Sequence, residues 1–233
     1  MSHKIPPTLF IETATPRCSV GLLDGNGDWF EEEVEGKGSH SKELASCVNH
    51  LLAESGVESE ALTSIVLGRG PGSFTGLRIG ASFVRGYCFG RDIPIMMMDT
   101  LAALAGLVCL QKIEHVGHSE SLEIHAILDA RRTHVYHWSG TWVLTPEGEH
   151  LLETTSSQAI RPIKEVEATL SKASSVVLTG FGLERLTLTN PEIQTLTPPK
   201  YLSRGQKWLF ETQNAHSHMV STNPKDAVPL YLS

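Results

Sequence analysis

The order of the strands and helices expected in the first part of the chain constrains its fold more than any other feature. Three strand-like runs open the sequence, at residues 8–13, 18–24 and 28–35, and the Asn26-Gly27 step between the last two is a strong signal for a tight hairpin. Helices and strands then alternate, with a helix at 41–55, a strand at 63–68, a helix at 73–89 and a strand at 93–98. The order βββαβαβ predicts an α/β lobe made of an antiparallel meander and helical crossovers.

The first helix is expected to bury one face. Its apolar residues recur at helical spacing and form a single stripe: Leu44, Cys47, Val48, Leu51 and Leu52. Ser39 or Ser41 is expected to cap its start, and Gly56 to end it in a left-handed conformation.

The same element order returns in the second half of the chain. After a helix at 100–110, strands are expected at 123–129, 133–138 and 141–145, then a helix at 157–173 and a strand at 175–179. This is the pattern of ribonuclease H-like lobes, including each half of the actin-like ATPases. We therefore expect an α/β actin-like ATPase fold (ASKHA, ribonuclease H-like), with two βββαβα lobes around a cleft. Residues 1–110 are assigned to the first lobe and residues 111–233 to a smaller second lobe.

Composition excludes several classes of protein. The 233 residues are 40% hydrophobic, enough for a substantial core, and the longest apolar stretch is broken by Pro94 and Asp99, so no membrane span is expected. Four scattered cysteines and an N-terminus without a leader predict a cytoplasmic, reduced protein. A net charge of -7 does not suit direct binding of nucleic acid, so any RNA would be held mostly by another chain.

A glycine-rich loop, GRGPGSFTGLRIG at residues 68–80, joins a strand to a helix. Its glycines permit unusual backbone angles, Ser73 or Thr75 can cap the helix, and the helix start could hold an anion. It lacks GK[ST] and is not G-x-G-x-x-G in register, so neither phosphate fingerprint applies. Local chemistry favours a tight structural turn made of Gly70, Pro71, Gly72, Ser73, Thr75 and Gly76.

Two carboxylates end the first strand of each half, Glu12 and Asp129, and are expected to face the cleft between the lobes. In actin-like ATPases such positions manage Mg²⁺ and phosphate. Here Arg131 and Arg132 follow Asp129 and would crowd a phosphate loop, although arginines can also bind anions. We expect a vestigial nucleotide cleft with weak ATP or ADP binding at most, formed by Glu12, Thr13, Asp129, Arg131, Gly180 and Gly182.

Catalytic chemistry has no recognisable motif in the sequence. None of the eleven histidines stands beside further ligands at a known metal-binding spacing, and neither HExxH nor HxxxH occurs. No GxSxG elbow is present, and no cysteine has a histidine partner in a known motif. We expect no catalytic residue, no metal and no required cofactor.

The second helix is apolar on two faces. Leu77, Ala81, Val84 and Cys88 form one face, and Ile79, Phe83 and Tyr87 form the other. One face can pack on the helix's own sheet. The other either packs inside the same domain or needs a partner, which Gly80, Ala81 and Ser82 would allow to approach closely.

Four segments resemble the bacterial TsaB family, also called YeaZ, in order along nearly the whole chain: LFIETATPRCSVGLLD (9–24), GRGPGSFTGLRIGASFVRG (68–86), LDARRTHVY (128–136) and VPLYLS (228–233). The resemblance implies an actin-like, two-lobed fold and a role in making N6-threonylcarbamoyladenosine (t6A) at position 37 of tRNAs that read ANN codons. TsaB is the degenerate sister of TsaD, which transfers the threonylcarbamoyl group and carries a metal-binding HxxxH motif. The corresponding stretch here, residues 96–104, contains no histidine. Glu12 stands where the family commonly has Asp, and Ser233 where its PxYLR ending has Arg.

The resemblance implies a non-catalytic scaffold subunit that dimerises with TsaD and, in a ternary complex with the ATPase TsaE, allows turnover. tRNA would be contacted only through the complex, and the docking surface could also close on a second copy to give a homodimer. That surface is expected to comprise Leu44, Val48, Leu51, Ile79, Phe83 and Tyr87. An independent ATP-dependent enzyme of the sugar-kinase and actin-like type is the alternative. A metallopeptidase, suggested by the older glycoprotease name of TsaD relatives, is disfavoured by the missing HxxxH.

Overall fold

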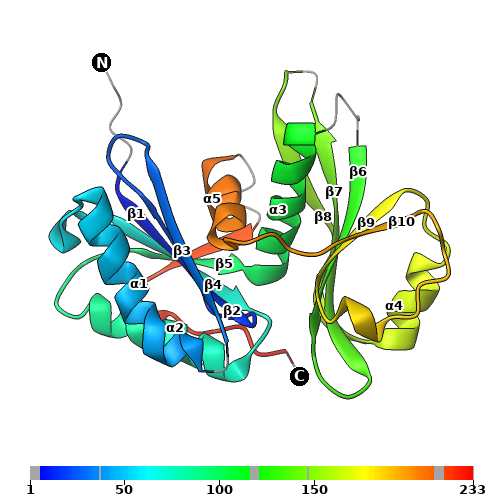
Figure 1. The fold of residues 1–233 in the computed structure, drawn as a ribbon, viewed down its shortest axis with the longest axis horizontal. Helices are drawn as coiled ribbons and strands as arrows, with labels where there is room; N and C mark the ends of the chain where they lie inside the picture. Colours follow the sequence, from blue (N-terminus) through cyan, green and yellow to red (C-terminus); the bar gives the residue numbers. More distant parts are fainter. Residues whose placement is uncertain (1–5, 37, 116–120, 146, 213–217, 233) are drawn as a thin grey trace.

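In the computed structural model the chain forms two lobes, each built on a mixed β-sheet (Figure 1). The structure describes residues 6–36, 38–115, 121–145, 147–212 and 218–232. Each sheet has an antiparallel meander on one side of its first strand and parallel strands next to it on the other, and the first sheet ends in one more antiparallel strand, so the predicted two-lobed fold is confirmed. Of the described helices, none combines the length and the apolar character needed to cross a membrane.

The first sheet has six strands in the order β11-β5-β4-β1-β2-β3. β1 is antiparallel to β2 and parallel to β4, and all five of its residues are buried because helices cover both faces of the sheet. The strands are β1 (Thr8–Glu12), β2 (Arg17–Leu23), β3 (Trp29–Glu35), β4 (Ser64–Gly70), β5 (Ile95–Asp99) and β11 (Met219–Thr222).

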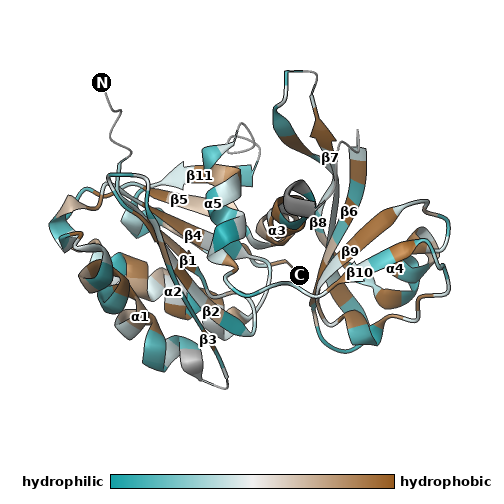
Figure 2. Cartoon of the chain, turned by 45° about the horizontal axis from the view of Figure 1, so that its top comes forward, coloured by the Kyte–Doolittle hydropathy of each residue, from teal (hydrophilic) through white to brown (hydrophobic). Residues whose placement is uncertain are grey.

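Two layers of helices enclose this sheet. α1 (Ser39–Ser55) and α2 (Phe74–Tyr87) cover its outer face, whereas α3 (Thr100–His115) and α5 (Ser203–Glu211) lie between the lobes (Figure 1). In Figure 2, β1 and β4 are hydrophobic, while α1 carries both hydrophilic and hydrophobic residues, as expected for a helix with one face in solvent. Short 3₁₀ turns lie at Ser59–Ala61, Leu183–Arg185 and Pro224–Asp226.

The ends of the two outer helices differ from one another. Of the two predicted caps, Ser73 or Thr75, it is Ser73 that caps α2, since the Gly76 amide donates to Ser73 Oγ at 3.2 Å. α1 starts after Gly38, which has φ 80° and provides no side-chain cap, so the predicted serine cap is wrong. Gly56 ends α1 in the left-handed conformation, as predicted.

The second sheet has five strands in the order β10-β9-β6-β7-β8. Two predictions here are wrong. The strands expected at 133–138 and 141–145 form one strand, in which Gly140 makes room for the Trp138 ring, and the helix expected from 157 begins only after β8 ends at Pro162. The elements are β6 (Ser121–Asp129), β7 (His134–Leu144), β8 (His150–Pro162), α4 (Ile163–Leu170), β9 (Val176–Phe181) and β10 (Ile193–Leu196).

A single apolar cluster joins the two sheets through α3. It includes Phe10 and Met98 of the first sheet, Ile124 and Trp138 of the second, and buried residues in the first part of α3, such as Leu104. α3 is apolar around its circumference because both sheets pack against it. Gln158 of β8 also donates to Asp99 of β5 at 3.0 Å, so polar and apolar contacts both fix the lobes to one another.

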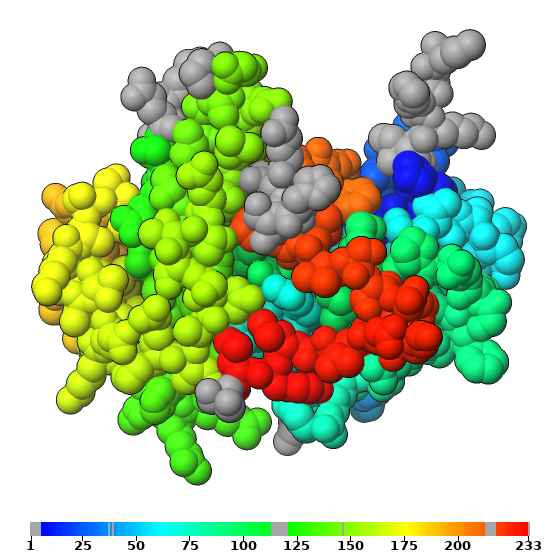
Figure 3. Space-filling model, turned by 180° about the vertical axis from the view of Figure 1, so that it is seen from behind, coloured from blue at the N-terminus to red at the C-terminus, as the bar shows by residue number. Residues whose placement is uncertain are grey.

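The chain returns to the first lobe after β10. We expected all of 111–233 in the second lobe, whereas α5 packs on β1 and β2 and β11 pairs with β5. The final segment lies on the surface where the lobes meet (Figure 3, red). It is held there because Arg85 donates to the Ala227 carbonyl at 2.8 Å and the Leu230 amide donates to the Arg69 carbonyl at 2.7 Å.

Candidate functional site

A cleft of about 880 Å³ opens between the lobes. Loops at the carboxyl ends of β1 and β6 face one another across it, together with the glycine-rich loop and the segment before α1. Its lining residues are Ala14, Thr15, Pro16, Glu35, Gly36, Gly38, His40, Gly72, Ser73, Phe74, Thr75, Leu128, Asp129, Ala130, Arg131, Tyr136 and Phe181.

The structure does not place Glu12 in this cleft. Its side chain is buried in the first lobe and accepts hydrogen bonds from the Ala14 amide at 2.7 Å and from Thr100 Oγ1 at 2.9 Å. Burial raises the pKa of Glu12 from 4.5 to about 7, although these hydrogen bonds oppose the shift. Thr13 is also fully buried. Both residues therefore support the loop that begins at Ala14, and they do not face a ligand.

The glycine-rich loop owes its glycines to close packing on this same segment. Added side chains at Gly72 and Gly76 would overlap the carbonyl groups of Ala14 and Thr13, and one at Gly80 would meet the Thr13 hydroxyl. The Ser73 amide also donates to the Ala14 carbonyl at 2.7 Å.

At the start of the loop, the Gly70 amide donates to Thr100 Oγ1 at 3.2 Å, and Pro71 is buried. Ser73 and Thr75 are exposed and line the cleft. These contacts favour the structural-turn interpretation of the motif over a phosphate cradle.

Asp129 lies at the cleft, but an arginine neutralises it. Arg185, in the 3₁₀ turn after β9, forms an ion pair with Asp129 Oδ1, and the Arg131 amide donates to the same oxygen at 2.7 Å. Gly182 has φ 99° and lies against Asp129, while Gly180 packs so closely on Ile127 that no side chain fits. Sequence reasoning missed Arg185, because it lies 56 residues from Asp129 and belongs to no motif.

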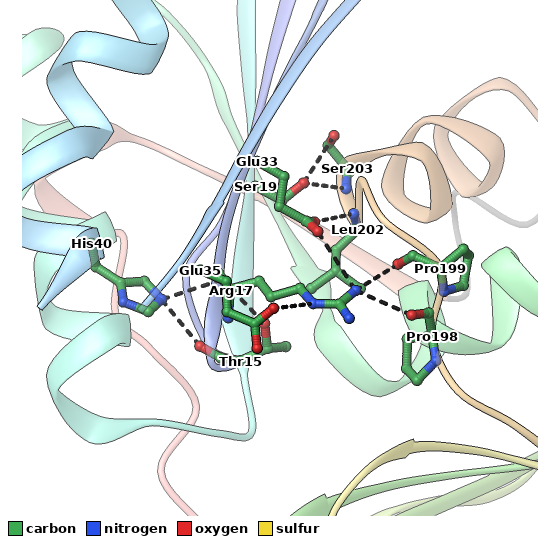
Figure 4. Close-up of polar contacts among 10 residues, drawn as sticks. All are labelled: Thr15, Arg17, Ser19, Glu33, Glu35, His40, Pro198, Pro199, Leu202 and Ser203. Carbon is green, nitrogen blue, oxygen red and sulfur yellow. Dashed lines mark hydrogen bonds and ion pairs between the residues drawn. The ribbon is translucent and has the colours of Figure 1, made fainter. Parts of the chain in front are cut away.

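Arg17 fastens the side of the cleft to the segment that connects the lobes (Figure 4). Its Nη1 donates to the carbonyls of Pro198 and Pro199 at 3.1 and 2.8 Å, and its guanidinium lies 5.2 Å from the centre of the Phe181 ring. It also pairs with Glu33 at 3.5 Å. A residue of the first lobe thus holds both the connecting segment and a cleft residue of the second.

Further hydrogen bonds extend this cluster (Figure 4). Glu33 accepts from the Leu202 amide at 2.9 Å, and Ser19 Oγ accepts from the Ser203 amide at 3.1 Å. His40 Nε2 lies 3.0 Å from the Thr15 carbonyl and must carry the proton, since a carbonyl can only accept. Sequence reasoning missed this cluster as well. One signal for it is present in the sequence. Alternate residues of a strand lie on one face, and on β3 these are Trp29, Glu31, Glu33 and Glu35.

A second depression, of about 530 Å³, lies between α1 and α2. We call it the α1–α2 groove. It is lined by His40, Ser41, Leu44, Ala45, Phe74, Thr75, Arg78, Ile79, Ser82 and Phe83. His40, Phe74 and Thr75 also line the cleft, so the two depressions are continuous.

The predicted docking residues divide into two groups. Leu44, Val48 and Leu51 are at most 2% exposed and belong to the chain's own core, so they are not a free surface. Their helical stripe packs on the sheet. Ile79, Phe83 and Tyr87 are half-buried, and Tyr87 is engaged within the chain by a 2.8 Å hydrogen bond to Ser59. The exposed rim of the groove is made instead by Ala45, Ser82 and their neighbours.

Within the described residues, no group of three or more His, Cys, Asp or Glu side chains is arranged to hold a metal ion. All four cysteines are buried and unpaired, and burial raises the pKa of the Cys47 thiol to about 11, away from the range of reactive thiols.

Comparison with known proteins gives matches in sequence and in structure. A family model described as "TsaD: tRNA N6-adenosine threonylcarbamoyltransferase" matches residues 35–207. The tRNA threonylcarbamoyladenosine biosynthesis protein TsaB of Haemophilus influenzae is 34% identical over 128 residues, which cover 55% of this chain and 51% of that protein. TsaB of Escherichia coli is 36% identical over 98 residues, 42% of each chain. The chain thus spans about half the length of these curated relatives, or less.

The structural match is more extensive. YeaZ from Pseudomonas aeruginosa superposes with a TM-score of 0.73 at 26% identity, covering 98% of this chain and 100% of that one. Together with the TsaD family model and the matches to TsaB proteins, this agreement shows that the chain belongs to the TsaB (YeaZ) family, which is related to TsaD.

Proposed function

We propose that this chain is a non-catalytic partner subunit required for t6A modification of adenosine 37 in tRNA, and that it acts by dimerising with TsaD. The names of its relatives support the pathway. TsaE would join as the ATPase of the ternary complex, and tRNA would bind through the complex, in keeping with the net charge of -7.

The observation that carries the proposal is the α1–α2 groove. Its rim includes two small exposed residues, Ala45 and Ser82, at which another helix can approach closely, and half-buried Ile79 and Phe83 offer apolar surface beneath them. In the absence of TsaD the same groove would accept a second copy of the chain, related by a twofold axis.

The state of two carboxylates supports a non-catalytic role. An ATP-dependent enzyme of this fold would use both of them. Glu12 is buried and hydrogen-bonded, and Asp129 is neutralised by Arg185, so both are already engaged within the chain. The ATP-dependent alternative would require Asp129 to exchange its arginine for Mg²⁺.

Substitutions on the rim separate docking from folding. Ala45→Glu and Ser82→Glu place a charge in the proposed contact without touching the core, whereas half-buried Phe83 also packs on the chain's own core. Ala168→Glu, at an exposed alanine of α4 in the other lobe, is the matched control.

Each variant would be co-expressed with its cognate TsaD and examined by co-purification, circular dichroism and quantification of t6A in tRNA. We expect both rim variants to fold but to bind TsaD at least about tenfold more weakly, because a buried unpaired charge opposes association. The control should bind normally. Unchanged affinity in both rim variants would refute this docking surface.

A further inference from the structure

A separate cavity of about 350 Å³ lies between β3, α3, α5 and the segment that connects the lobes. We call it the tryptophan pocket. Its apolar walls come from Trp29, Leu107, Leu110 and Trp208, and none of its lining residues lines the cleft or the α1–α2 groove. A volume of this size lies at the small end of the range for ligand cavities in proteins, about 300–1,000 Å³.

Contacts within the chain hold the Trp29 side chain in place. Its ring lies across Gly21, where any side chain would overlap it, and packs edge-on against Phe10 with ring centres 5.3 Å apart. Its Nε1 donates to Glu31 at 2.6 Å. Because these contacts hold the ring, a planar ligand could pack on it beside the Lys207 ammonium, whose Nζ lies 5.6 Å from the ring centre.

Trp208, on α5, is also held by packing. It is 7% exposed, and it packs against Gly106, where α3 and α5 approach closely. The pocket is therefore preformed by packing between β3 and the two helices.

The mouth of the pocket is positively charged. Three cations, Lys200, Arg204 and Lys207, line it with one carboxylate, Glu211. Lys207 pairs with Glu211 at 2.6 Å, and Arg204 pairs with Glu31. Lys200 is exposed and takes part in none of the ion pairs found among the described residues. These ion pairs leave one positive charge in excess at the mouth, that of Lys200, and it favours an anionic ligand.

We propose that the tryptophan pocket binds a small aromatic anion, with its ring against Trp29 and Trp208 and its carboxylate or phosphate near Lys200. This inference is independent of the proposed partnership with TsaD. Lys200 and Pro199 belong to the segment that Arg17 holds, so a bound ligand would contact the junction of the two lobes.

The test uses the full chain and two probes of nearly equal shape, naphthalene-2-carboxylate and the neutral naphthalene-2-carboxamide. Calorimetry measures affinity, and NMR of the indole N–H groups reports the place of binding. We expect the carboxylate to bind at least about fivefold more tightly than the amide, and to shift the signals of Trp29 and Trp208.

Lys200→Glu should weaken carboxylate binding by at least about fivefold while leaving the amide unchanged. Lys172→Glu, at an exposed lysine of the second lobe, should change neither probe. These exposed substitutions leave the core intact.

Three results would overturn the proposal: no binding of either probe at millimolar concentration, equal affinities that Lys200→Glu does not alter, or binding that leaves the indole signals of Trp29 and Trp208 unchanged. Binding of an RNA hairpin that depends on Lys200, without binding of the naphthalene acids, would assign the basic mouth to nucleic acid and reject the small-molecule pocket.

Discussion

Replacing Arg17 by alanine should loosen the junction between the lobes. The side chain is 14% exposed, donates to the Pro198 and Pro199 carbonyls, and pairs with Glu33, whose side chain is 4% exposed. Its ring contact with Phe181 would also be lost.

The contacts give the magnitude. A hydrogen bond to a charged group contributes about 1.5–3 kcal/mol, and here two carbonyls share one Nη1, so they count for less than two full bonds. Removing one partner of a buried ion pair costs about 3–5 kcal/mol. The cost should be smaller here, because Glu33 still accepts a hydrogen bond from the Leu202 amide. The pair with Glu35, which is 65% exposed, adds little. We expect the free energy of unfolding to fall by about 3 kcal/mol.

Urea unfolding followed by circular dichroism and tryptophan fluorescence would measure this loss. A double-mutant cycle with Glu33→Gln should give a coupling energy of at least about 1 kcal/mol, and Lys164→Ala, at an exposed residue of α4, should cost less than about 0.5 kcal/mol. A loss below about 1 kcal/mol in Arg17→Ala would refute the reasoning that Arg17 fastens the connecting segment.

Three further predictions follow from the site. Gly76→Ala should lower the free energy of unfolding by about 2 kcal/mol or more, because the new methyl group overlaps a backbone carbonyl. Gly86→Ala, in open space on the same helix, should raise it by up to about 1 kcal/mol. Thermal unfolding of both variants tests this, and equal effects would contradict it. Because the pKa of Glu12 is raised in the folded state, ionisation of Glu12 opposes folding. The free energy of unfolding should therefore fall by roughly 3 kcal/mol as pH rises from about 4.5 to 7. Urea unfolding across this pH range should show a smaller fall in Glu12→Gln. Calorimetry with Mg²⁺-ATP should show no micromolar binding, since Asp129 is already paired; micromolar binding that Asp129→Ala abolishes would instead favour the ATP-dependent enzyme.

Most of the first lobe between residues 8 and 99 could be predicted because its signals are local. The hairpin at Asn26-Gly27, the apolar stripe of α1 and the cap at Ser73 each depend on residues close in sequence. The sequence also predicts that Leu44, Val48 and Leu51 of this stripe belong to a docking surface. In the structure they pack in the chain's own core instead. Spacing reveals that a face is buried, but it does not reveal what buries it.

The second lobe and the site depend on contacts between distant residues, which no local pattern reports. Ser139-Gly140 has the composition of a turn, yet Gly140 lies inside a strand because the Trp138 ring needs its space. The pair between Asp129 and Arg185 forms only once β6 and β9 lie side by side, and the contact of Arg17 with Pro199 forms only once the connecting segment reaches the first lobe. For the same reason no local pattern indicates that α5 and β11 return to the first lobe.

Reconstitution of t6A synthesis from purified components tests the central claim most directly. The chain would be assayed alone with tRNA and a donor of the threonylcarbamoyl group, then with its cognate TsaD and TsaE, and the TsaD–TsaE mixture would be assayed without it. We expect no modified adenosine from the chain alone, multiple turnovers from the complete mixture, and loss of turnover when the chain is omitted. Modification by the chain alone, or undiminished turnover in its absence, would contradict its assignment as a required non-catalytic partner.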